Sequence, residues 1–485
     1  MVICSKTTGF SRLLQTPCVS LVNIHHTLFE IITKEIFDVI IIGLGPAGLA
    51  ASATLQDSGL RVAVVDSGKP ARERDRYDAT DATSGHGGAG LFSDGKFSFF
   101  PSATELWTLK DQVVLRKAYS WTCNLLQSHG LDTPPFPSRP DQYSAKNHNL
   151  REMKEFVLKS YPSDYLSLPA RMDLIDDLIS QVKAEVFNQC HVEDITYDFV
   201  SDAFTLSIID NRQDPALISL STRRVLYATG RFGPLGSGLM NLTSHHKFRR
   251  LEAGFRIEQQ SDRAFFRNMK QLDPKLRFVS PDRSVEWSTF CVCRQGETVL
   301  TKTEGLWTVS GRSDCPPTGR SNTGFNTLIK DASLSSRNLV PLIKSMSDKA
   351  SSFEISLQGA LHRDPLCVKV LDDIYGPDLR LNMMAGLAKL AHTYPDLRSD
   401  KDAKLIGQTL EGVGWYHKVD GHLRLLDTPV FVAGDACGLF RGIVAALISG
   451  YYSAFLLERE LMVSRALDGK MDSSVISLSR VPLSL

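Results

Sequence analysis

Residues 37–66 read FDVIIIGLGPAGLAASATLQDSGLRVAVVD, and this stretch decides the fold. Its apolar, β-branched run at 39–42 predicts a buried parallel strand. The glycine motif GLGPAG follows at 43–48, and the pattern at 49–56 predicts a helix. A second apolar strand at 61–66 ends in an aspartate. Strand, glycine turn, helix, strand and terminal acid therefore occur in order within one short segment.

The glycine motif is a G-x-G-x-x-G, and each of its three glycines has a structural purpose. Gly43 makes a tight turn, Gly45 lets a pyrophosphate approach the backbone, and Gly48 lets helix and strand pack closely. The helix N-terminus offers unpaired N–H groups to the phosphates. Asp66, at the end of the second strand, is placed to accept hydrogen bonds from the adenosine ribose. The segment predicts dinucleotide binding without separating FAD from NAD.

The bulk composition is that of an ordinary globular protein. The chain has 485 residues, enough for two or three domains, with 42% hydrophobic and 22% charged residues. The net charge of +1 gives no reason to expect nucleic acid or an anionic membrane as a partner. The nine cysteines are scattered and odd in number, which favours reduced thiols. No spacing of a zinc type is completed, so we expect no metal site.

Two segments bear on location. The longest apolar run, 443–457, is too short to span a bilayer and predicts a buried helix, so no integral membrane segment is expected. Residues 1–36 are an N-terminal extension that is mildly similar to an organelle transit peptide. We expect a cytoplasmic protein, with an organelle as the alternative if 1–36 directs import. Residues 466–485 are expected to be a C-terminal tail.

The next part of the chain alternates between loop and sheet. Residues 84–96 hold five glycines within eleven positions, which excludes a stable helix and suits close approach of backbone to a flat ligand. Strands at 191–197 and 203–209 form a hairpin, and a third at 219–227 leads into Ala-Thr-Gly. This order returns the chain to the nucleotide-binding sheet.

The second half divides in two. Residues 241–372 carry short strands and few helix signals, which predicts a mostly antiparallel α+β substrate domain. Residues 373–465 return to the dinucleotide-binding domain, which begins at 37–240 and is therefore discontinuous. Near its end a strand at 429–433 runs into Gly-Asp-Ala-Cys-Gly, followed by a long apolar helix. Its N-terminal dipole would stabilise charge on a reduced flavin.

The chain resembles the two-domain FAD-dependent oxidoreductases in GLGPAG, in YATG at 227–230 and in VAGDACG at 432–438. More narrowly, it resembles the poorly characterised FAD-dependent dehydrogenases. That resemblance lies in GGAGLFSDGK at 87–96, GFRIE at 254–258, FCVCRQG at 290–296 and GRSNTGFNTL at 319–328. It implies an α/β fold, a glutathione-reductase-like two-domain flavoprotein whose Rossmann-type FAD-binding domain carries a second, mostly antiparallel α+β domain.

The resemblance also implies which residues contact the FAD. One group would hold the pyrophosphate and the ribose: Gly43, Gly45, Pro46, Ala47, Gly48, Asp66 and Ser67. Others would meet the adenine (Val192) or lie near the nucleotide (Gly230). A last group would meet the ribityl arm and the isoalloxazine: Gly88, Ser93, Asp94, Gly434, Asp435, Gly442 and Ile443.

This chain departs from that family at two places. The family's terminal motif commonly reads Gly-Glu-Gly-Ala-Gly, where this chain has Gly434-Asp435-Ala436-Cys437-Gly438. Its C-x-C segment usually continues with Pro-Gly-Gly, where this chain has Arg294-Gln295-Gly296. The first change keeps an acid, whereas the second leaves the substrate open.

Candidate catalytic side chains each have an alternative. Cys291 and Cys293 lie two apart on an expected strand, so both could face one cavity as a redox pair, or both could be inert core thiols. His86 could shuttle protons or make a structural hydrogen bond. Three further residues could bind or orient a substrate carboxylate or carbonyl, or form ordinary internal contacts: Arg256, Arg320 and Asn322.

The function expected is that of an FAD-dependent oxidoreductase of the dehydrogenase or reductase type, with hydride transfer through the flavin to or from a small organic molecule. No second G-x-G-x-x-G follows a strand, so NAD(P)H would act only as a transient donor or acceptor at the flavin. Oxygen or a protein are alternative electron partners. A monooxygenase, an oxidase or a non-catalytic FAD-binding protein are the alternative functions, and the oligomeric state stays open.

Overall fold

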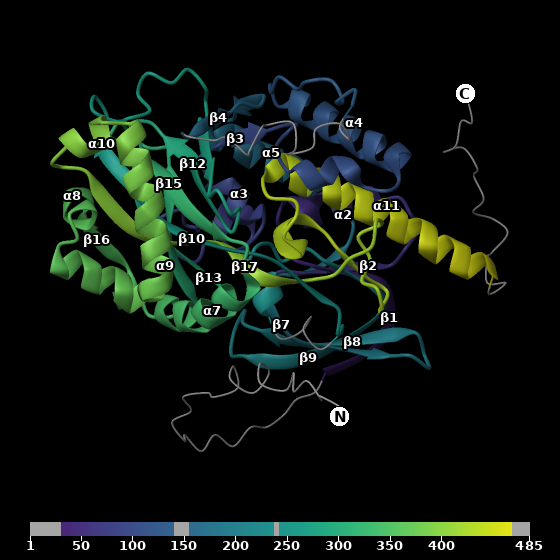
Figure 1. Cartoon of the computed structure of the whole chain (residues 1–485). Helices are drawn as coiled ribbons and strands as arrows, with labels where there is room; N and C mark the ends of the chain where they lie inside the picture. The colour runs from purple at the N-terminus through teal and green to yellow at the C-terminus, as the bar shows by residue number, and fades with distance from the viewer. Residues whose placement is uncertain (1–30, 140–154, 237–241, 468–485) are drawn as a thin grey trace, which may run out of the picture.

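The computed structural model describes residues 31–139, 155–236 and 242–467, and it is built around two large β-sheets (Figure 1). The first sheet has the strand order β6-β2-β1-β9-β8-β7, with β18 paired to β9. Its strands are β1 (Ile31–Ile42), β2 (Val62–Val65), β6 (Glu185–Phe187), β7 (Cys190–Asp198), β8 (Ala203–Asp210), β9 (Ala216–Tyr227) and β18 (Val430–Val432). The pairs among β6, β2, β1, β9 and β18 are parallel, and β7, β8 and β9 form an antiparallel meander.

The second sheet is antiparallel throughout, with the order β16-β17-β10-β15-β12-β11-β4. Its strands are β4 (Val157–Lys159), β10 (His246–Gln260), β11 (Lys275–Val279), β12 (Val285–Cys293), β15 (Arg320–Ile329), β16 (Phe353–Ser356) and β17 (Lys404–His417). Two small sheets join β3 (Lys96–Ser98) to β5 (Ser163–Tyr165) and β13 (Glu297–Thr303) to β14 (Leu306–Arg312). The expected fold class is confirmed: a Rossmann-like α/β sheet with a mostly antiparallel second sheet.

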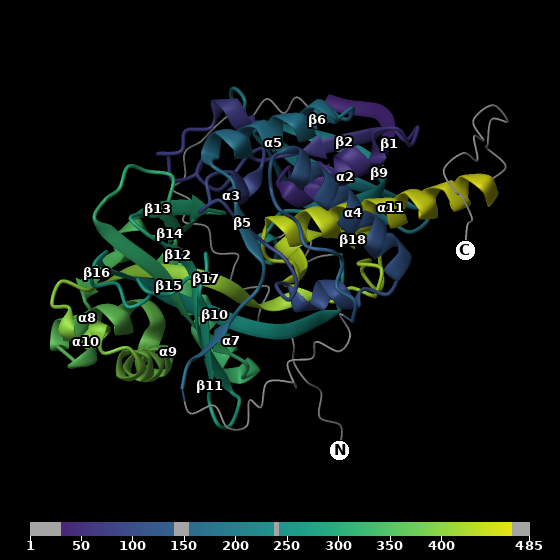
Figure 2. The same cartoon turned by 90° about the horizontal axis from the view of Figure 1, so that it is seen from above.

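Helices flank each sheet separately (Figure 2). The first sheet carries α2 (Pro46–Leu55), α4 (Gln112–Ser128), α5 (Leu168–Ser180) and α11 (Ile443–Leu467). The second carries α7 (Ala332–Met346), α8 (Leu357–Leu361), α9 (Pro365–Thr393) and α10 (Asp396–Ser399), on its side away from the first sheet. Short helical turns are η1 (Ala71–Glu73), α3 (Gly88–Leu91), η2 (Thr104–Thr108), η5 (Gly233–Leu235), η6 (Lys349–Ser351) and η7 (Gly434–Cys437). Each sheet with its helices buries its own apolar cluster.

Helix α11 crosses α2 at close range because a glycine lies at the contact. A side chain at Gly450 would overlap the backbone of Ala47. The N-terminal turn and the C-terminal helix, far apart in the sequence, therefore lie side by side. No helix of the described residues is long and apolar enough to cross a membrane.

The chain passes between the two sheets more often than the sequence pattern indicated. Strand β4 pairs with β11 in the second sheet, although it precedes the meander. Helix α9 and strand β17, placed by the sequence after the return at residue 373, pack with the second sheet. We therefore propose that the return to the first sheet begins after β17 and that residues 157–159 belong with 242–417.

The terminal segments lie mostly outside the described residues. Residues 31–36 of the expected extension form the start of β1. Residues 1–30, which carry the transit-peptide hypothesis, and residues 468–485 of the expected tail are not among those described. The expected hairpin and its return strand are confirmed as β7, β8 and β9. The expectation that 84–96 holds no helix is wrong for one turn, α3, which begins after Gly87 in a left-handed conformation at φ 81°.

Candidate functional site

A cavity of about 780 Å³ lies where the two sheets meet. On one side it is lined by residues at the carboxyl ends of the first sheet's strands, among them Ile42, Val65 and Tyr227. On the other side it is lined by side chains of the second sheet, including Glu252, Arg256 and Lys275. Ligands of open α/β sheets bind at the carboxyl ends of the strands, so this cavity is the candidate site.

Two glycines of the motif serve the fold of the turn itself. Gly43 has φ +95°, and a side chain there would come within 2.7 Å of the Ala228 carbonyl oxygen. A side chain at Gly48 would overlap the Gly43 carbonyl oxygen. Gly48 does not line the cavity, so its role is the close packing of α2 on β1.

Gly45 differs, because nothing within the protein requires a glycine there. Its backbone is extended, at φ −71°, and a Cβ would meet only Gly88 at 3.7 Å, an ordinary contact. That Cβ would lie against the cavity, beside the N-terminus of α2. The missing side chain leaves a cradle at a helix N-terminus, where a phosphate group fits.

Asp66 is buried and supports the same turn. One carboxylate oxygen accepts a hydrogen bond from the Leu44 amide at 2.6 Å, and the other accepts one from the Gly68 amide at 2.8 Å. The residue also lines the cavity. Its carboxylate therefore fixes the glycine turn whether or not it also meets a ribose.

The glycine-rich segment 84–96 bridges the turn and the C-terminal helix. A side chain at Gly88 would meet the Gly45 backbone at 3.1 Å, and one at Gly90 would meet Ile443 at 3.0 Å. Arg171 on α5 secures the segment by donating to the carbonyl oxygens of Leu91 at 2.9 Å and Ser93 at 3.2 Å. No local pattern in the sequence indicates Arg171, since its partners lie far away in the chain.

Almost all residues expected to contact FAD line this one cavity. They are Gly43, Gly45, Pro46, Ala47, Asp66, Ser67, Gly88, Ser93, Asp94, Val192, Gly230, Gly434, Asp435, Gly442 and Ile443. Gly48, as described above, is the one that does not. The structure brings these residues together from six separate segments of the chain.

The candidate catalytic residues separate into three places. Cys291 and Arg256 line the cavity, and Cys293 and Asn322 lie buried behind them. Arg256 joins the group: its Nε donates to Asn322 Oδ1 at 2.6 Å, and its Nη2 donates to the Cys291 carbonyl oxygen at 2.6 Å. Both are contacts within the protein, the alternative that the sequence left open for Arg256, and binding of a substrate carboxylate by Arg256 stays a prediction.

His86 and Arg320 do not line the cavity. The imidazole of His86 is buried, and its Nε2 lies 2.5 Å from Asn188 Oδ1, which favours the structural hydrogen bond over a proton shuttle. The guanidinium of Arg320 pairs with Glu258 at 2.5 Å on the outer part of β10 and β15. Arg320 therefore already forms an ordinary ion pair, one of the two alternatives that the sequence left open for it.

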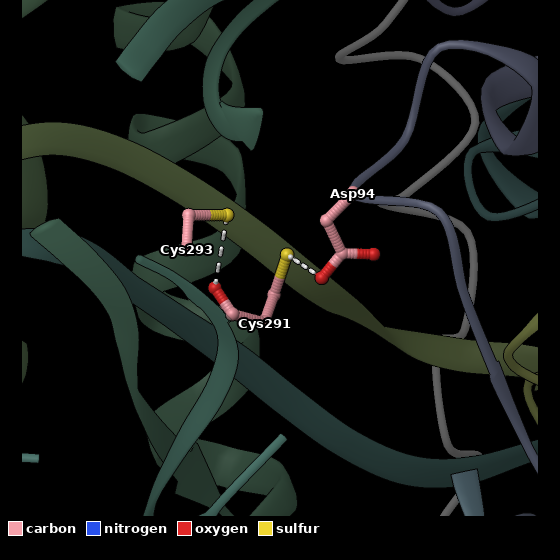
Figure 3. A group of neighbouring side chains, drawn as sticks. All are labelled: Asp94, Cys291 and Cys293. Atoms are coloured by element: carbon pink, nitrogen blue, oxygen red, sulfur yellow. Dashed lines mark hydrogen bonds between the residues drawn. The ribbon is translucent and has the colours of Figure 1, made fainter. Parts of the chain in front are cut away.

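Of the two cysteines, Cys291 lines the cavity and Cys293 does not, although on a regular strand both could face it. A bulge interrupts the pairing of β12 with β15 between Phe290 and Cys293, and Cys291 takes a left-handed φ of +51°. Cys291 consequently faces the cavity, whereas Cys293 is fully buried. Figure 3 shows the Cys291 thiol directed at Asp94, which comes from the glycine-rich segment.

Charged groups surround these thiols. The Cys291 Sγ donates to Asp94 Oδ2 at 3.0 Å, and Lys96 Nζ lies 2.9 Å from the same oxygen and 3.6 Å from Asp273. Burial alone would raise the pKa of Asp94, but Lys96 and the Cys291 thiol outweigh it and lower that pKa. Burial opposes the charge on Lys96, yet Asp94 and Asp273 raise its pKa.

An arginine–acid cluster joins the two sheets at the cavity, and sequence reasoning missed most of it. Arg441, just before α11, lies 3.3 Å from Glu252, 3.2 Å from Glu411 and 3.3 Å from Asp435. Arg231 pairs with Glu411 at 2.5 Å. Burial would raise the pKa of Glu252, but Arg441 and Arg250 hold it well below its usual range. On β10 and β17, Glu252 and Glu411 alternate with apolar residues. This alternation is the only signal in the sequence that could have indicated these two acids as residues of the site.

Two lysines at the second-sheet end of the cavity lie opposite each other. Lys159 on β4 and Lys275 on β11 are register partners, and both line the cavity. Burial and the neighbouring Lys275 lower the pKa of Lys159 to about 8. The nearby Glu286 is already paired with Arg277 at 2.5 Å and Lys330 at 3.5 Å. Like charges placed directly opposite are unfavourable, so this end of the cavity favours an anionic group.

Comparison with known protein families agrees with the dinucleotide-binding motif that forms part of the cavity's first wall. Residues 38–86 match the family model described as FAD binding domain. This chain carries an FAD-binding domain. No curated protein matches the sequence.

Solved structures with a comparable fold are all distant. A flavoprotein/dehydrogenase from Cytophaga hutchinsonii is 15% identical, with a TM-score of 0.39 over 90% of this chain and 80% of that chain. A geranylgeranyl bacteriochlorophyll reductase-like protein from Thermoplasma acidophilum is 12% identical, with a TM-score of 0.37 over 89% and 80%. An anhydrotetracycline hydroxylase from Streptomyces rimosus is 12% identical, with a TM-score of 0.37 over 90% and 65%. Likeness at this level carries no argument about the reaction.

Proposed function

We propose that the chain is an FAD-dependent oxidoreductase of the dehydrogenase or reductase type, acting on a small organic molecule by hydride transfer through the flavin. The observation that carries the proposal is the shared cavity. Its first wall is the FAD-binding domain, and its second wall supplies charged side chains that no dinucleotide motif requires. A cofactor site that opens onto a second, differently built wall is the arrangement that a redox reaction on a separate substrate needs.

The residues that would hold the FAD are the ones expected from the sequence. Gly45 and the N-terminus of α2 would bind the pyrophosphate, and Asp66 would meet the ribose. Gly434, Asp435 and the start of α11 would bind the ribityl arm and the flavin ring. When bound, the flavin supplies hydride or electron transfer.

The second wall would bind the substrate. We assign the contact with an anionic part of the substrate to Lys159 and Lys275, because they are register partners on neighbouring strands and both line the cavity. Arg256 and Arg320 already have partners within the protein. We therefore favour a small molecule that carries a carboxylate or a phosphate. Both lysines are held on strands, so the charge would be positioned without ordering a loop.

We place this activity in a reducing compartment such as the cytoplasm. The seven cysteines among the described residues are all free thiols, and none is paired. Structural disulfides are common in secreted proteins, so their absence from the described part of the chain fits reducing surroundings.

The test starts with the purified full chain. A folded, yellow protein that releases FAD on denaturation is expected, and anaerobic NADPH or NADH should bleach it if a pyridine nucleotide is the donor. Rapid oxygen consumption with hydroxylated product would instead favour the monooxygenase alternative. A folded protein that is colourless and takes up no added FAD would overturn the proposal.

A further inference from the structure

We propose that Cys291 and Cys293 form a redox-active dithiol–disulfide couple in the cavity wall, and that it exchanges two electrons with the FAD. The inference rests on the proposed function for its electron partner. Its structural basis is independent of that function. Figure 3 shows two thiols and a carboxylate that come from distant parts of the chain. The buried cations Lys96 and Arg256 lie beside them.

The bulge in β12 brings the two thiols within reach of each other. In an extended strand, residues two apart are separated by about 7 Å, near the upper limit of the Cα distance that a disulfide spans. The left-handed φ of +51° at Cys291 bends the chain at this point. The sulfur atoms of Cys291 and Cys293 consequently lie within 4.8 Å of each other. A non-glycine residue in this conformation is unfavourable, and such strain concentrates at functional sites.

The two thiols have different surroundings, as the two members of a redox couple require. Cys293 lies 3.8 Å from the Arg256 guanidinium. The neighbouring Cys291 thiol and the positive charges of Arg256 and Lys96 lower the pKa of Cys293 to about 7. The pKa of Cys291 is raised instead, by its neighbour Cys293, by burial and by Asp94. Near neutral pH the pair can therefore hold one thiolate and one thiol.

The chemistry balances with the flavin as oxidant. As the S–S bond forms, the two sulfurs give up two electrons, Cys291 releases its proton along the hydrogen bond to Asp94, and Cys293 gives up any proton it still holds. The two electrons would pass to bound oxidised FAD together with two protons, the second of which comes from solvent when Cys293 is already a thiolate. The reverse reaction returns the disulfide to two thiols. Cys291 and Asp94 both line the cavity, so the proton has an outlet there.

A metal ion is the competing use of this cluster, since Asp94, Cys291 and Cys293 could offer three ligand atoms. The charges argue against it. Lys96 lies 2.9 Å from the Asp94 carboxylate, and Arg256 lies beside the Cys293 sulfur. A divalent cation would have to be placed next to two buried cations, which Coulomb repulsion opposes.

The first experiment follows the thiols themselves. The full chain, with and without FAD, is equilibrated in a series of glutathione redox buffers, trapped with an alkylating reagent and digested with trypsin. Both cysteines fall in one peptide, residues 284–294. We expect this peptide to change from doubly alkylated to unalkylated and two hydrogens lighter as the buffer becomes oxidising. A peptide that stays doubly alkylated, a disulfide from Cys293 to Cys315, or stoichiometric zinc that protects the thiols would each overturn the couple.

The second experiment follows the electrons. Fully oxidised holoprotein is titrated anaerobically with dithionite, and we expect wild type to take up four electrons per flavin. Cys291→Ser should take up two, and the matched control Cys367→Ser, a buried thiol of the same half, should still take up four. Two electrons in wild type would overturn the exchange with flavin. A protein that holds no flavin would instead overturn the proposed function, while the peptide measurement would still decide whether the dithiol is redox-active.

Discussion

The wall of the cavity that comes from the first sheet is built largely of backbone and small residues, whereas the wall from the second sheet carries several charged side chains. The first wall contains glycine turns and helix N-termini around Gly45, Gly88 and Gly434. The second wall contains Glu252, and we count with it Arg441, which reaches Glu252 from the segment before α11. The difference teaches that cofactor recognition is encoded locally in the chain, whereas the substrate end depends on partners that meet only after folding.

Substitutions at two glycines of the G-x-G-x-x-G motif should distinguish a packing role from a ligand-binding role. The variant at Gly48 should lose more stability than any other variant described below. Gly48→Val should abolish folding or cost several kcal/mol, because its side chain would overlap the Gly43 carbonyl. Gly45→Ala should fold with an unchanged melting temperature as apoprotein, yet bind FAD at least about tenfold more weakly. Thermal unfolding of the apoprotein and titration with FAD provide the two readouts. Normal FAD affinity in Gly45→Ala would mean that the cradle is not the phosphate site.

On the second wall, Arg441→Met should destabilise the protein by about 2–3 kcal/mol, since it leaves the buried Glu252 and Glu411 without a shared partner. The pKa of Glu252 lies below its unfolded value, so its stabilising contribution is present above about pH 4.5 and is lost as the pH falls. Denaturant unfolding of both proteins between pH 7 and pH 3 measures this.

The difference in the free energy of unfolding between wild type and Arg441→Met should therefore become smaller toward acid pH. The control is Lys369→Met, which removes an exposed ion pair with Asp373 and should cost less than about 0.5 kcal/mol at any pH. If the two variants lose the same free energy of unfolding, the cluster around Arg441 contributes no more than an exposed ion pair. The contrast between the two walls would then be wrong.

The lysine pair should discriminate ligands more than it affects stability. Inorganic phosphate or succinate should raise the melting temperature of wild type, and Lys159→Met should weaken that binding about five- to tenfold. The ligand needs protonated Lys159, whose pKa is about 8, so binding should weaken as the pH rises through 8. Lys330→Met is the matched control, because Lys330 pairs with Glu286 and does not line the cavity. Equal anion binding by all three proteins would remove the substrate assignment.

Arg320→Met should have a small effect, and on stability alone. Arg320→Met should lose about 1 kcal/mol of stability through its ion pair with Glu258, and leave FAD affinity and turnover unchanged. Measuring both properties in one variant tests whether the cavity's second wall ends before this part of β15. A large fall in turnover with normal stability would return Arg320 to the substrate site.

How much the sequence predicts follows the same division. The glycine turn, Asp66 and the strands of the first sheet other than β6 could be predicted because each depends on residues adjacent in the chain. The positions of β4 and β17 could not, because antiparallel pairing joins segments far apart and leaves no local signal. For Cys291 and Cys293 the sequence predicts the regular period of a strand, and the bulge in β12 breaks that period. Arg256 lines the cavity, but its contact with Asn322 has no local signal in the sequence.

The order of the segments around the cavity has a consequence for how the protein is made. Gly43 and Gly45 emerge from the ribosome several hundred residues before Gly434, Gly442 and α11. Until α11 packs across α2, the groove for the cofactor lacks one of its sides. Capture of flavin must therefore wait until α11 has been synthesised and released, and a product truncated before residue 434 would keep the recognition motif without the means to retain what it recognises.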